Sequence, residues 1–451
     1  MATSLHAFRV GILEEHLEEA SFLYSQCRHM RLNAGKSWRL LEDFEQRLEL
    51  HLDALVIGGE LALDLCILRA VEGDFGELFT AVCLYCRQNQ APLLAQVFSQ
   101  LDTNDPDRTN AVADALKYEL PQHWSPFVEQ ALNRQDDRLL PVLAVACGYR
   151  RMPCELALSA ALERLPSPPV ALLDALGRIR AASAVDGLKS VVSLATTRPL
   201  LQSAALIALL RIGKIESLHA QYLVAQKESW PRIAMGIAGD ASAAHALAQP
   251  LSSGQVDESS IFALGLLGVP STLRFLHEYL EDPELAPCAA RAMNWICGAD
   301  LFEDAYVAEP INEDELFPRE IKAWRQYREV PLAADGRPFG LNERKLSIDS
   351  AMWHNWFASN ISRFEPQLRY RSGKPYAPIV LFENMAHPQG DGLLRKYAAE
   401  ELAIRYGCDI PFETDMPVTQ QVRALRAIRK WVRERDGLFQ PGGWVVNGRA
   451  G

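Results

Sequence analysis

The chain has 451 residues, of which 49% are hydrophobic and 23% are charged, and its formal net charge is −11. This composition is that of a folded protein with a large apolar core, and the acidic excess argues against non-specific binding of nucleic acid. The longest segments without Asp, Glu, Lys or Arg, 241–256 and 259–273, are too short and too often interrupted by Pro or Gly to span a membrane.

The first residues, MATSLHAFRVGILEEH, contain one Arg and soon become acidic. They lack the basic start, the apolar core and the small-residue cleavage site of a signal peptide, so we expect a cytoplasmic protein. Nine cysteines are scattered through mostly apolar helical contexts, which is typical of reduced thiols in a protein core.

An N-terminal helical region is predicted for residues 1–100. In its first helix, Ile12, Leu13, His16, Leu17 and Ala20 recur at helical spacing and mark the packed face, while glutamates at 14, 15, 18 and 19 take the other face. A second amphipathic helix covers residues 40–55 and ends at the Gly58-Gly59 pair, since glycine is the usual residue just past a helix end.

Two runs in this region carry a family resemblance. They are EHLEEASFLY at 15–24 and FEQRLELHLDAL at 44–55, the latter followed by Gly58-Gly59-Glu60. They resemble the N-terminal signature of an uncharacterised bacterial HEAT-repeat family commonly encoded in type VI secretion gene clusters, with Tyr24 where Trp is usual and Ala54 where Gly is usual. The run GLLRKYAAEELA at 392–403 extends the resemblance. It implies a secretion-associated protein and brings no catalytic residues.

Clustered glutamates on a helix usually form no more than a solvated face. Because the family signature falls here, we also keep His16 and Glu19 as candidates for a surface that docks a partner.

Residues 101–305 are predicted to form a repeat array. The segment ALLRI at 208–212 matches ALGRI at 175–179, and ALGLL at 263–267 and AMNWI at 292–296 follow, with a degenerate copy, MGIAG, at 235–239. Intervals of this length correspond to two-helix units whose small residues allow close helix packing. The predicted fold class is therefore all-α, a HEAT-like α-solenoid with an extended concave surface and an irregular aromatic-rich insertion.

That insertion covers residues 306–385, where prolines and glycines interrupt the helical period. Its many aromatic residues indicate that it is ordered against the array, with short helices over 313–327 and 350–359. Periodicity cannot decide between strand and helix over residues 379–382. Trp353 and Trp356 are candidates for partner binding, and the equally weighted alternative is that both cover the apolar end of the array.

The C-terminal region, 386–451, is predicted to contain a helical pair and a tail. Its second helix carries six basic residues on one stripe: Arg423, Arg426, Arg429, Lys430, Arg433 and Arg435. We take a solvated face as the first interpretation. The stripe is also the one place where an acidic partner or nucleic acid is plausible, with Arg426 and Arg433 as candidate contacts.

Motifs for catalysis or cofactors are not found in the sequence. Cys83 and Cys86 form a CxxC pair, but they lie in an apolar helical context without a second pair, so we expect core packing rather than metal or redox chemistry. The histidines form no HxxxH or HExxH pattern, and there is no phosphate-binding GxxxxGK[ST] motif. We predict no catalytic residues, no cofactor and no metal.

Together these features predict a non-enzymatic protein-binding scaffold: an adaptor or chaperone for a type VI secretion effector or spike component. An alternative of the same class is an immunity protein that binds a co-encoded toxin. An alternative of another class is a HEAT-like DNA-base glycosylase, which would need a basic concave channel and a catalytic carboxylate. We expect a protein partner, no membrane contact and no nucleic acid.

Overall fold

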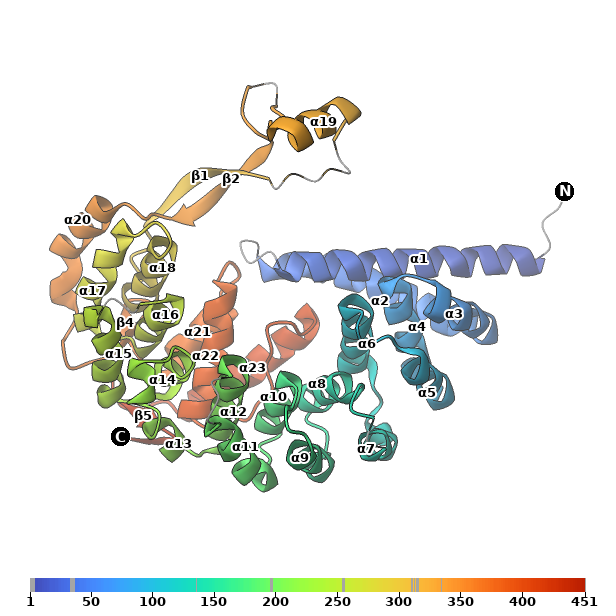
Figure 1. Cartoon of the computed structure of the whole chain (residues 1–451), viewed down its shortest axis with the longest axis horizontal. Coiled ribbons are helices and arrows are strands. Elements are labelled where there is room, and N and C mark those ends of the chain that lie inside the picture. Colours follow the sequence, from blue (N-terminus) through green and yellow to red (C-terminus); the bar gives the residue numbers. More distant parts are fainter. Residues whose placement is uncertain are drawn as a thin grey trace.

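The computed structural model describes residues 5–32, 37–134, 136–194, 198–253, 256–309, 311, 313, 316–333 and 335–450. Within these residues the chain forms 23 α-helices and six short β-strands, arranged as a curved body with a projecting arm (Figure 1). The prediction of a mostly helical, all-α protein is confirmed. None of the described helices is long and apolar enough to cross a bilayer.

Eight helices follow one another along the inner side of the curve, each in contact with the next. These inner helices are α4 (Phe75–Arg87), α6 (Pro106–Glu119), α8 (Leu140–Arg150), α10 (Val170–Arg178), α12 (Pro199–Ile212), α14 (Arg232–Ala238), α16 (Glu258–Leu267) and α18 (Ala286–Cys297). The helices between them form a second, outer layer: α5 (Ala91–Gln100), α7 (Ser125–Asn133), α9 (Glu155–Arg164), α11 (Val185–Val192), α13 (Glu216–His219), α15 (Ala241–Ser253) and α17 (Leu273–Glu278).

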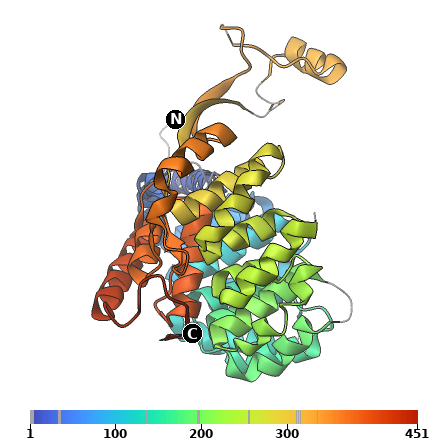
Figure 2. The ribbon, with the colours of Figure 1, turned by 90° about the vertical axis from the view of Figure 1, so that its left-hand side faces the viewer.

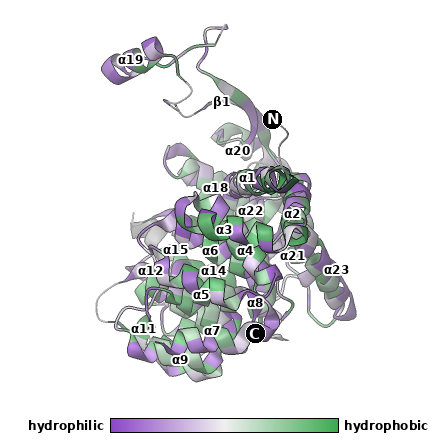
Figure 3. Cartoon of the chain, turned by 90° about the vertical axis from the view of Figure 1, so that its right-hand side faces the viewer, coloured by the Kyte–Doolittle hydropathy of each residue, from purple (hydrophilic) through white to green (hydrophobic). Residues whose placement is uncertain are grey.

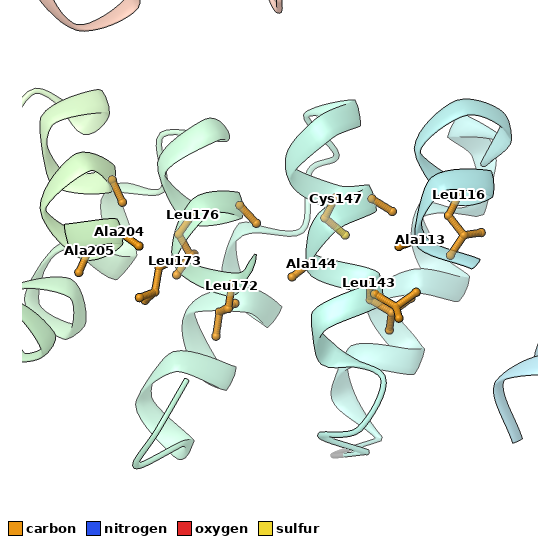
Figure 4. Packing of buried hydrophobic residues seen from close by; sticks show 14 of the residues in the cluster. Ala113, Leu116, Leu143, Ala144, Cys147, Leu172, Leu173, Leu176, Ala204 and Ala205 are labelled. Atoms are coloured by element: carbon orange, nitrogen blue, oxygen red, sulfur yellow. The ribbon is translucent and has the colours of Figure 1, made fainter. Parts of the chain in front are cut away.

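The apolar core runs along the whole series between neighbouring helices. Figure 4 shows buried residues on both sides of α8: Leu143 lies toward α6, which carries Ala113 and Leu116, and Ala144 lies toward α10, which carries Leu172 and Leu176. Each helix buries its apolar face against neighbouring helices of the series. The core is therefore continuous from the N-terminal helices to α18.

Small residues set the spacing of the inner helices. A Cβ atom on Gly148, Gly177 or Gly236 would lie 2.7 Å from the Cα atom of an alanine on the next inner helix. The glycine–alanine pairs are Gly148 with Ala175, Gly177 with Ala208, Gly236 with Ala263, and Gly265 with Ala292. The four alanines are those that open the repeated segments in the sequence, so the repeat marks the positions of closest helix approach.

At the N-terminus, α1 (Leu5–Leu32), α2 (Leu41–Gly58) and α3 (Glu60–Glu72) pack against α4. A capping box starts α4, since the Glu77 amide donates to Asp74 Oδ1 (2.8 Å) and the Asp74 amide donates to Glu77 Oε2 (2.9 Å). The inner series thus begins within residues 1–100, and the predicted boundary at residue 100 falls inside the stack.

The insertion differs from its predicted arrangement. Strand β1 (Phe302–Ala308) pairs antiparallel with β2 (Gly340–Leu346), Phe302 lying opposite Leu346. With α19 (Pro318–Tyr327) between them, these strands form an arm that projects from the body (Figures 1 and 2). No residue of β1, β2 or α19 is buried, so the expectation that the insertion packs on the array is wrong for the arm.

The remainder of the insertion does pack on the body. Helix α20 (Ser350–Asn360) lies against α17, where His277 Nε2 is 3.0 Å from the carbonyl oxygen of Ser350. Residues 379–382, left undecided by periodicity, belong to helix α21 (Pro378–Ala386).

The last part of the chain, residues 369–450, is called here the C-terminal segment. It contains β3 (Tyr370–Arg371), β4 (Lys374–Pro375), α21, α22 (Gly392–Arg405), α23 (Val418–Glu434), β5 (Val445–Val446) and β6 (Arg449–Ala450). Figure 1 shows its helices inside the curve, next to the inner helices. A second apolar cluster joins it to Trp38 and Leu41 near the N-terminus, so the segment spans the concave side from one end to the other.

Candidate binding surfaces

The concave side of the curved body is occupied by the chain's own C-terminal segment, and cations of the inner helices meet its carboxylates there. The ion pairs are Lys117 with Asp415, Arg151 with Glu413 (3.2 Å), Arg178 with Glu413 (3.1 Å), Arg211 with Glu400, and Arg291 with Asp391. The five cations come from the inner helices: α6, α10, α12 and α18 each carry one, and Arg151 directly follows α8. A row of basic groups that would otherwise face solvent is therefore neutralised within the molecule.

Arginines of the C-terminal segment make the reverse contact with the ends of inner helices. Arg405 donates to the carbonyl oxygens of Gly236 (3.3 Å) and Gly239 (3.0 Å) at the end of α14. Arg369 and Arg371 donate to the carbonyl oxygens of Leu267 (2.7 Å) and Leu266 (2.8 Å) at the end of α16. The last carbonyls of a helix lack intrahelical donors and carry partial negative charge, so each guanidinium satisfies a helix end.

Within the C-terminal segment, next to these contacts, the ion pair between Arg371 and Glu401 has no solvent exposure. Arg371 Nη2 donates to Glu401 Oε1 at 2.8 Å, and the Tyr376 hydroxyl donates to the same oxygen at 2.7 Å. Removing one partner of such a pair leaves a buried charge uncompensated, which is strongly unfavourable. Because Arg371 also donates to the carbonyl oxygen of Leu266, this buried pair fixes the C-terminal segment at the end of α16.

A small crevice of about 60 Å³ remains between the C-terminal ends of α8, α10 and α12 and helix α22. Arg151, Arg178 and Arg211 line it together with Glu400 and Glu413. Burial by itself raises the pKa of the Glu400 carboxyl, but the charges of Arg211, Arg178 and Lys396 and the hydrogen bond from Arg211 outweigh it, so the pKa lies below its ordinary value. A carboxylate held ionised in this way does not serve as a general acid near neutral pH.

The basic stripe of α23 contrasts with the concave side. Leu425, Ile428, Trp431 and Val432 are buried, whereas Arg423, Arg426, Arg429, Lys430 and Arg433 are exposed on the opposite face. Lys430 lies 3.8 Å from Glu434, and within the described part of the chain the other four form no ion pair. Figure 3 shows the outer face of α23 as hydrophilic. Both predicted contacts on this helix, Arg426 and Arg433, are thus accessible.

The two candidate tryptophans have different surroundings. Trp353 is completely buried, and its indole Nε1 donates to the carbonyl oxygen of Ser347 at 2.8 Å. Its proposed role as a surface contact is therefore corrected: it is a core residue that attaches α20 to the end of the helical series. Trp356 is half-buried and packs edge-on against Phe357, so part of its ring remains accessible.

His16 and Glu19 lie on α1, at the other end of the series. His16 Nδ1 is 3.0 Å from His51 Nδ1, so the two rings share one hydrogen bond across the α1–α2 contact. The exposed carboxylate of Glu19 lies 3.8 Å from Arg47. The six candidate residues therefore occupy three separate helices, α1, α20 and α23, and do not form one site.

Exposed apolar surfaces on α1 and on the arm were missed by the sequence reasoning. Ile12, assigned to the packed face of α1, is 37% exposed, and Phe8 and Phe22 are more so. A spacing of i, i+4 occurs on every face of a helix, so it cannot show which face another helix covers. The positions of α2 and α4 decide this.

Cys83 and Cys86 are buried in α4, as the core interpretation predicts. Burial raises the pKa of the Cys86 thiol to about 12, which keeps the thiol protonated. Among the residues that the structure describes, no group of three or more His, Cys, Asp or Glu side chains is placed to hold a metal ion.

No family model, curated protein or solved structure gives a match to this chain. The resemblance to the secretion-associated family therefore stays a prediction made from the residues at 15–24 and 44–55.

Proposed function

We propose that this chain is a cytoplasmic, non-enzymatic protein-binding scaffold: a HEAT-like solenoid that acts as an adaptor or chaperone for a type VI secretion effector or spike component. One observation carries the proposal. The cations of the concave side are neutralised by the chain's own carboxylates, whereas four exposed arginines of α23, Arg423, Arg426, Arg429 and Arg433, form no ion pair among the described residues.

The exposed groups are of the kind that bind proteins. Arginines and large aromatic residues carry much of the binding energy at protein interfaces, and Arg426, Arg433 and the accessible part of Trp356 supply them here. The secretion context rests on the resemblance of the two N-terminal runs. An immunity protein for a co-encoded toxin would use the same surfaces, because it too acts by binding a protein.

The glycosylase alternative requires an open, basic concave channel that admits duplex DNA. In this chain the C-terminal segment fills that side, and Arg151, Arg178 and Arg211 are paired with Glu413 and Glu400. The net charge of −11 adds long-range repulsion of a polyanion. Both features favour a protein partner.

The test is co-purification of the tagged chain with the products of neighbouring genes. The double variant Arg426→Glu, Arg433→Glu should lose the partner and keep the melting temperature, because both side chains are exposed. Lys189→Glu, which reverses an exposed cation on α11, is the matched control and should bind normally. Toxin neutralisation by the complex would select the immunity alternative.

A further variant separates binding from packing at α20. If Trp356→Ala weakens co-purification at an unchanged melting temperature, the ring contacts the partner. If the protein melts early and binding falls only with the folded fraction, the ring belongs to the core. Failure of every co-encoded protein to bind, together with steeply salt-dependent binding of labelled duplex DNA, would overturn the scaffold proposal.

A further inference from the structure

The first two turns of α1 extend beyond the helix on which the remainder of α1 packs. Helix α1 has 28 residues and α2 has 18, and the two run antiparallel, as the contacts of His16 with His51 and of Arg31 with Glu45 show. The end of α2 lies opposite Leu13, since a Cβ atom on Gly58 would be 2.6 Å from a Leu13 methyl carbon. Residues 5–12 therefore lie past α2, and no atom lies within 4 Å of a Cβ position on Gly11.

This overhang and the turns that follow it carry an exposed apolar stripe. Phe8 is 58% exposed and Phe22 is 55% exposed, with Ile12 between them. Glu15 and Glu19 lie between Ile12 and Phe22 on the same face of the helix, at intervals of three and four residues, and both are exposed. The α1 stripe, defined as Phe8, Ile12, Glu15, Glu19 and Phe22, is thus apolar with an acidic centre.

The arm presents a second apolar surface. Phe317 and Tyr327 at the two ends of α19 are 67% and 66% exposed, and Phe339 and Leu341 at the start of β2 are also exposed. A two-stranded hairpin with a short helix has too little apolar surface to form a core of its own. Exposed apolar groups of this number on a projecting element indicate a contact surface.

The α19 part of the arm and the α1 stripe have opposite charge. Four cations, Arg319, Lys322, Arg325 and Arg328, are exposed on or next to α19, and Glu320 is the one acidic residue of that helix. Arg325 is paired with Glu313, and within the described residues Arg319 and Lys322 form no ion pair. A basic, apolar α19 is therefore complementary to the acidic, apolar α1 stripe.

We propose that the occupant of both surfaces is a second copy of this chain, the arm of each copy lying on the α1 stripe of the other. The arm and α1 lie on the same side of the body in all three whole-molecule views (Figures 1, 2 and 3). When two copies face each other about a two-fold axis, the arm of the first copy can lie on α1 of the second. The same axis places the arm of the second copy on α1 of the first. A single isologous dimer thus covers both exposed surfaces. This inference does not depend on the identity of the scaffold's partner.

The test measures mass in solution by sedimentation equilibrium. The wild-type chain should be a dimer, and Phe8→Glu on α1 and Phe317→Glu on the arm should each raise the dimer dissociation constant by roughly tenfold or more. Leu156→Glu, the same kind of change at an exposed leucine of the outer helix α9, should leave the dimer intact. All three sites are exposed, so far-UV circular dichroism should show the same helix content for each variant.

Mixing the two dissociated variants gives the decisive measurement. A mixed dimer pairs the intact arm of the Phe8→Glu chain with the intact α1 of the Phe317→Glu chain. At a concentration where each variant alone is mainly monomeric, an equimolar mixture should therefore form dimer. A monomeric wild-type chain, a dimer that tolerates both variants, or a mixture without recovery would each overturn the proposal. Loss of a bound foreign protein from both variants of a monomeric chain would assign the two surfaces to that protein instead.

Discussion

Gly177 on α10 and Ala208 on α12 meet backbone to backbone, so closely that a Cβ atom on residue 177 would lie 2.7 Å from the Cα atom of Ala208. Ala208 is 1% exposed. The same relationship joins Gly148 to Ala175 and Gly236 to Ala263. The spacing of the inner helices is thus set at glycine–alanine contacts, where neither residue has room for a larger side chain.

Enlarging either residue should separate α10 from α12. We expect Ala208→Leu and Gly177→Ala each to lower the free energy of unfolding by about 1–3 kcal/mol, measured by urea denaturation. Gly11→Ala is the matched control, because a Cβ atom there meets nothing within 4 Å. That change should instead stabilise the helix by about 0.5–1 kcal/mol. Equal effects at residues 11 and 177 would contradict the close contact.

The ion pair between Arg211 and Glu400 should contribute far more to stability than an exposed pair does. Glu400→Gln leaves the Arg211 guanidinium enclosed without its counter-charge, at an expected cost of about 3–5 kcal/mol. Glu383→Gln, which breaks the exposed pair with Lys374, should cost about 1 kcal/mol or less. Similar denaturation midpoints for the two variants would show that the C-terminal segment is only loosely held.

Acid should release the C-terminal segment from the inner helices. Burial raises the pKa of the Asp391 and Asp415 carboxyls. The charge and hydrogen bonds of Arg291 at Asp391, and of Lys117 at Asp415, outweigh burial, so both pKa values lie below their ordinary range. The pKa of Glu400 is lowered in the same way. A carboxyl whose pKa is lower in the folded protein binds protons more readily in the unfolded chain. These three carboxylates therefore stabilise the fold above about pH 4, and the stabilisation is lost as the pH falls through their pKa values in the folded protein. The protection factors of α22 amides against hydrogen exchange, which correct for the slower intrinsic exchange in acid, should therefore fall as the pH drops below about 4. Glu400→Gln should show a weaker pH dependence.

The His16–His51 contact predicts a second pH effect near neutrality. Burial, together with the neighbouring His16, lowers the pKa of the His51 imidazole below its ordinary value of 6.5. The unfolded chain therefore takes up the proton first, so stability should rise as the pH rises through about 6.5 and fall below it. His51→Gln should flatten the dependence of the melting temperature on pH between about 5.5 and 7.5. An unchanged slope would contradict the coupling of the two rings.

The cysteines should differ sharply in reactivity. Eight of the nine are buried and Cys288 is partly exposed. In native protein a thiol reagent such as 5,5′-dithiobis(2-nitrobenzoate) should react with Cys288 first, and the remainder, including Cys83 and Cys86, should react only after unfolding. Cys288→Ala should abolish the early phase. Rapid modification of Cys83 or Cys86 in the native state would contradict their place in the core.

Local sequence patterns determined the helical elements of this protein. Alternation of apolar and polar residues at the helical period predicts α1, α2 and α23, and the recurring alanines at 175, 208, 263 and 292 mark the closest contacts of the inner helices. These features follow from sequence because each depends on residues within one or two turns of the same helix. The accessibility of Arg426 and Arg433 follows in the same way from the amphipathic spacing of α23.

Tertiary structure alone decided what covers each surface. Glu400 meets Arg211 across 189 residues and Asp415 meets Lys117 across 298, and no local pattern connects groups so far apart in the chain. The β1–β2 hairpin pairs strands whose charged and apolar residues do not alternate cleanly, so periodicity did not reveal it. Trp353 is buried and Phe8 exposed for one reason: a neighbouring element covers the first and stops short of the second. Burial depends on where distant elements come to lie, which the period of a single helix does not specify.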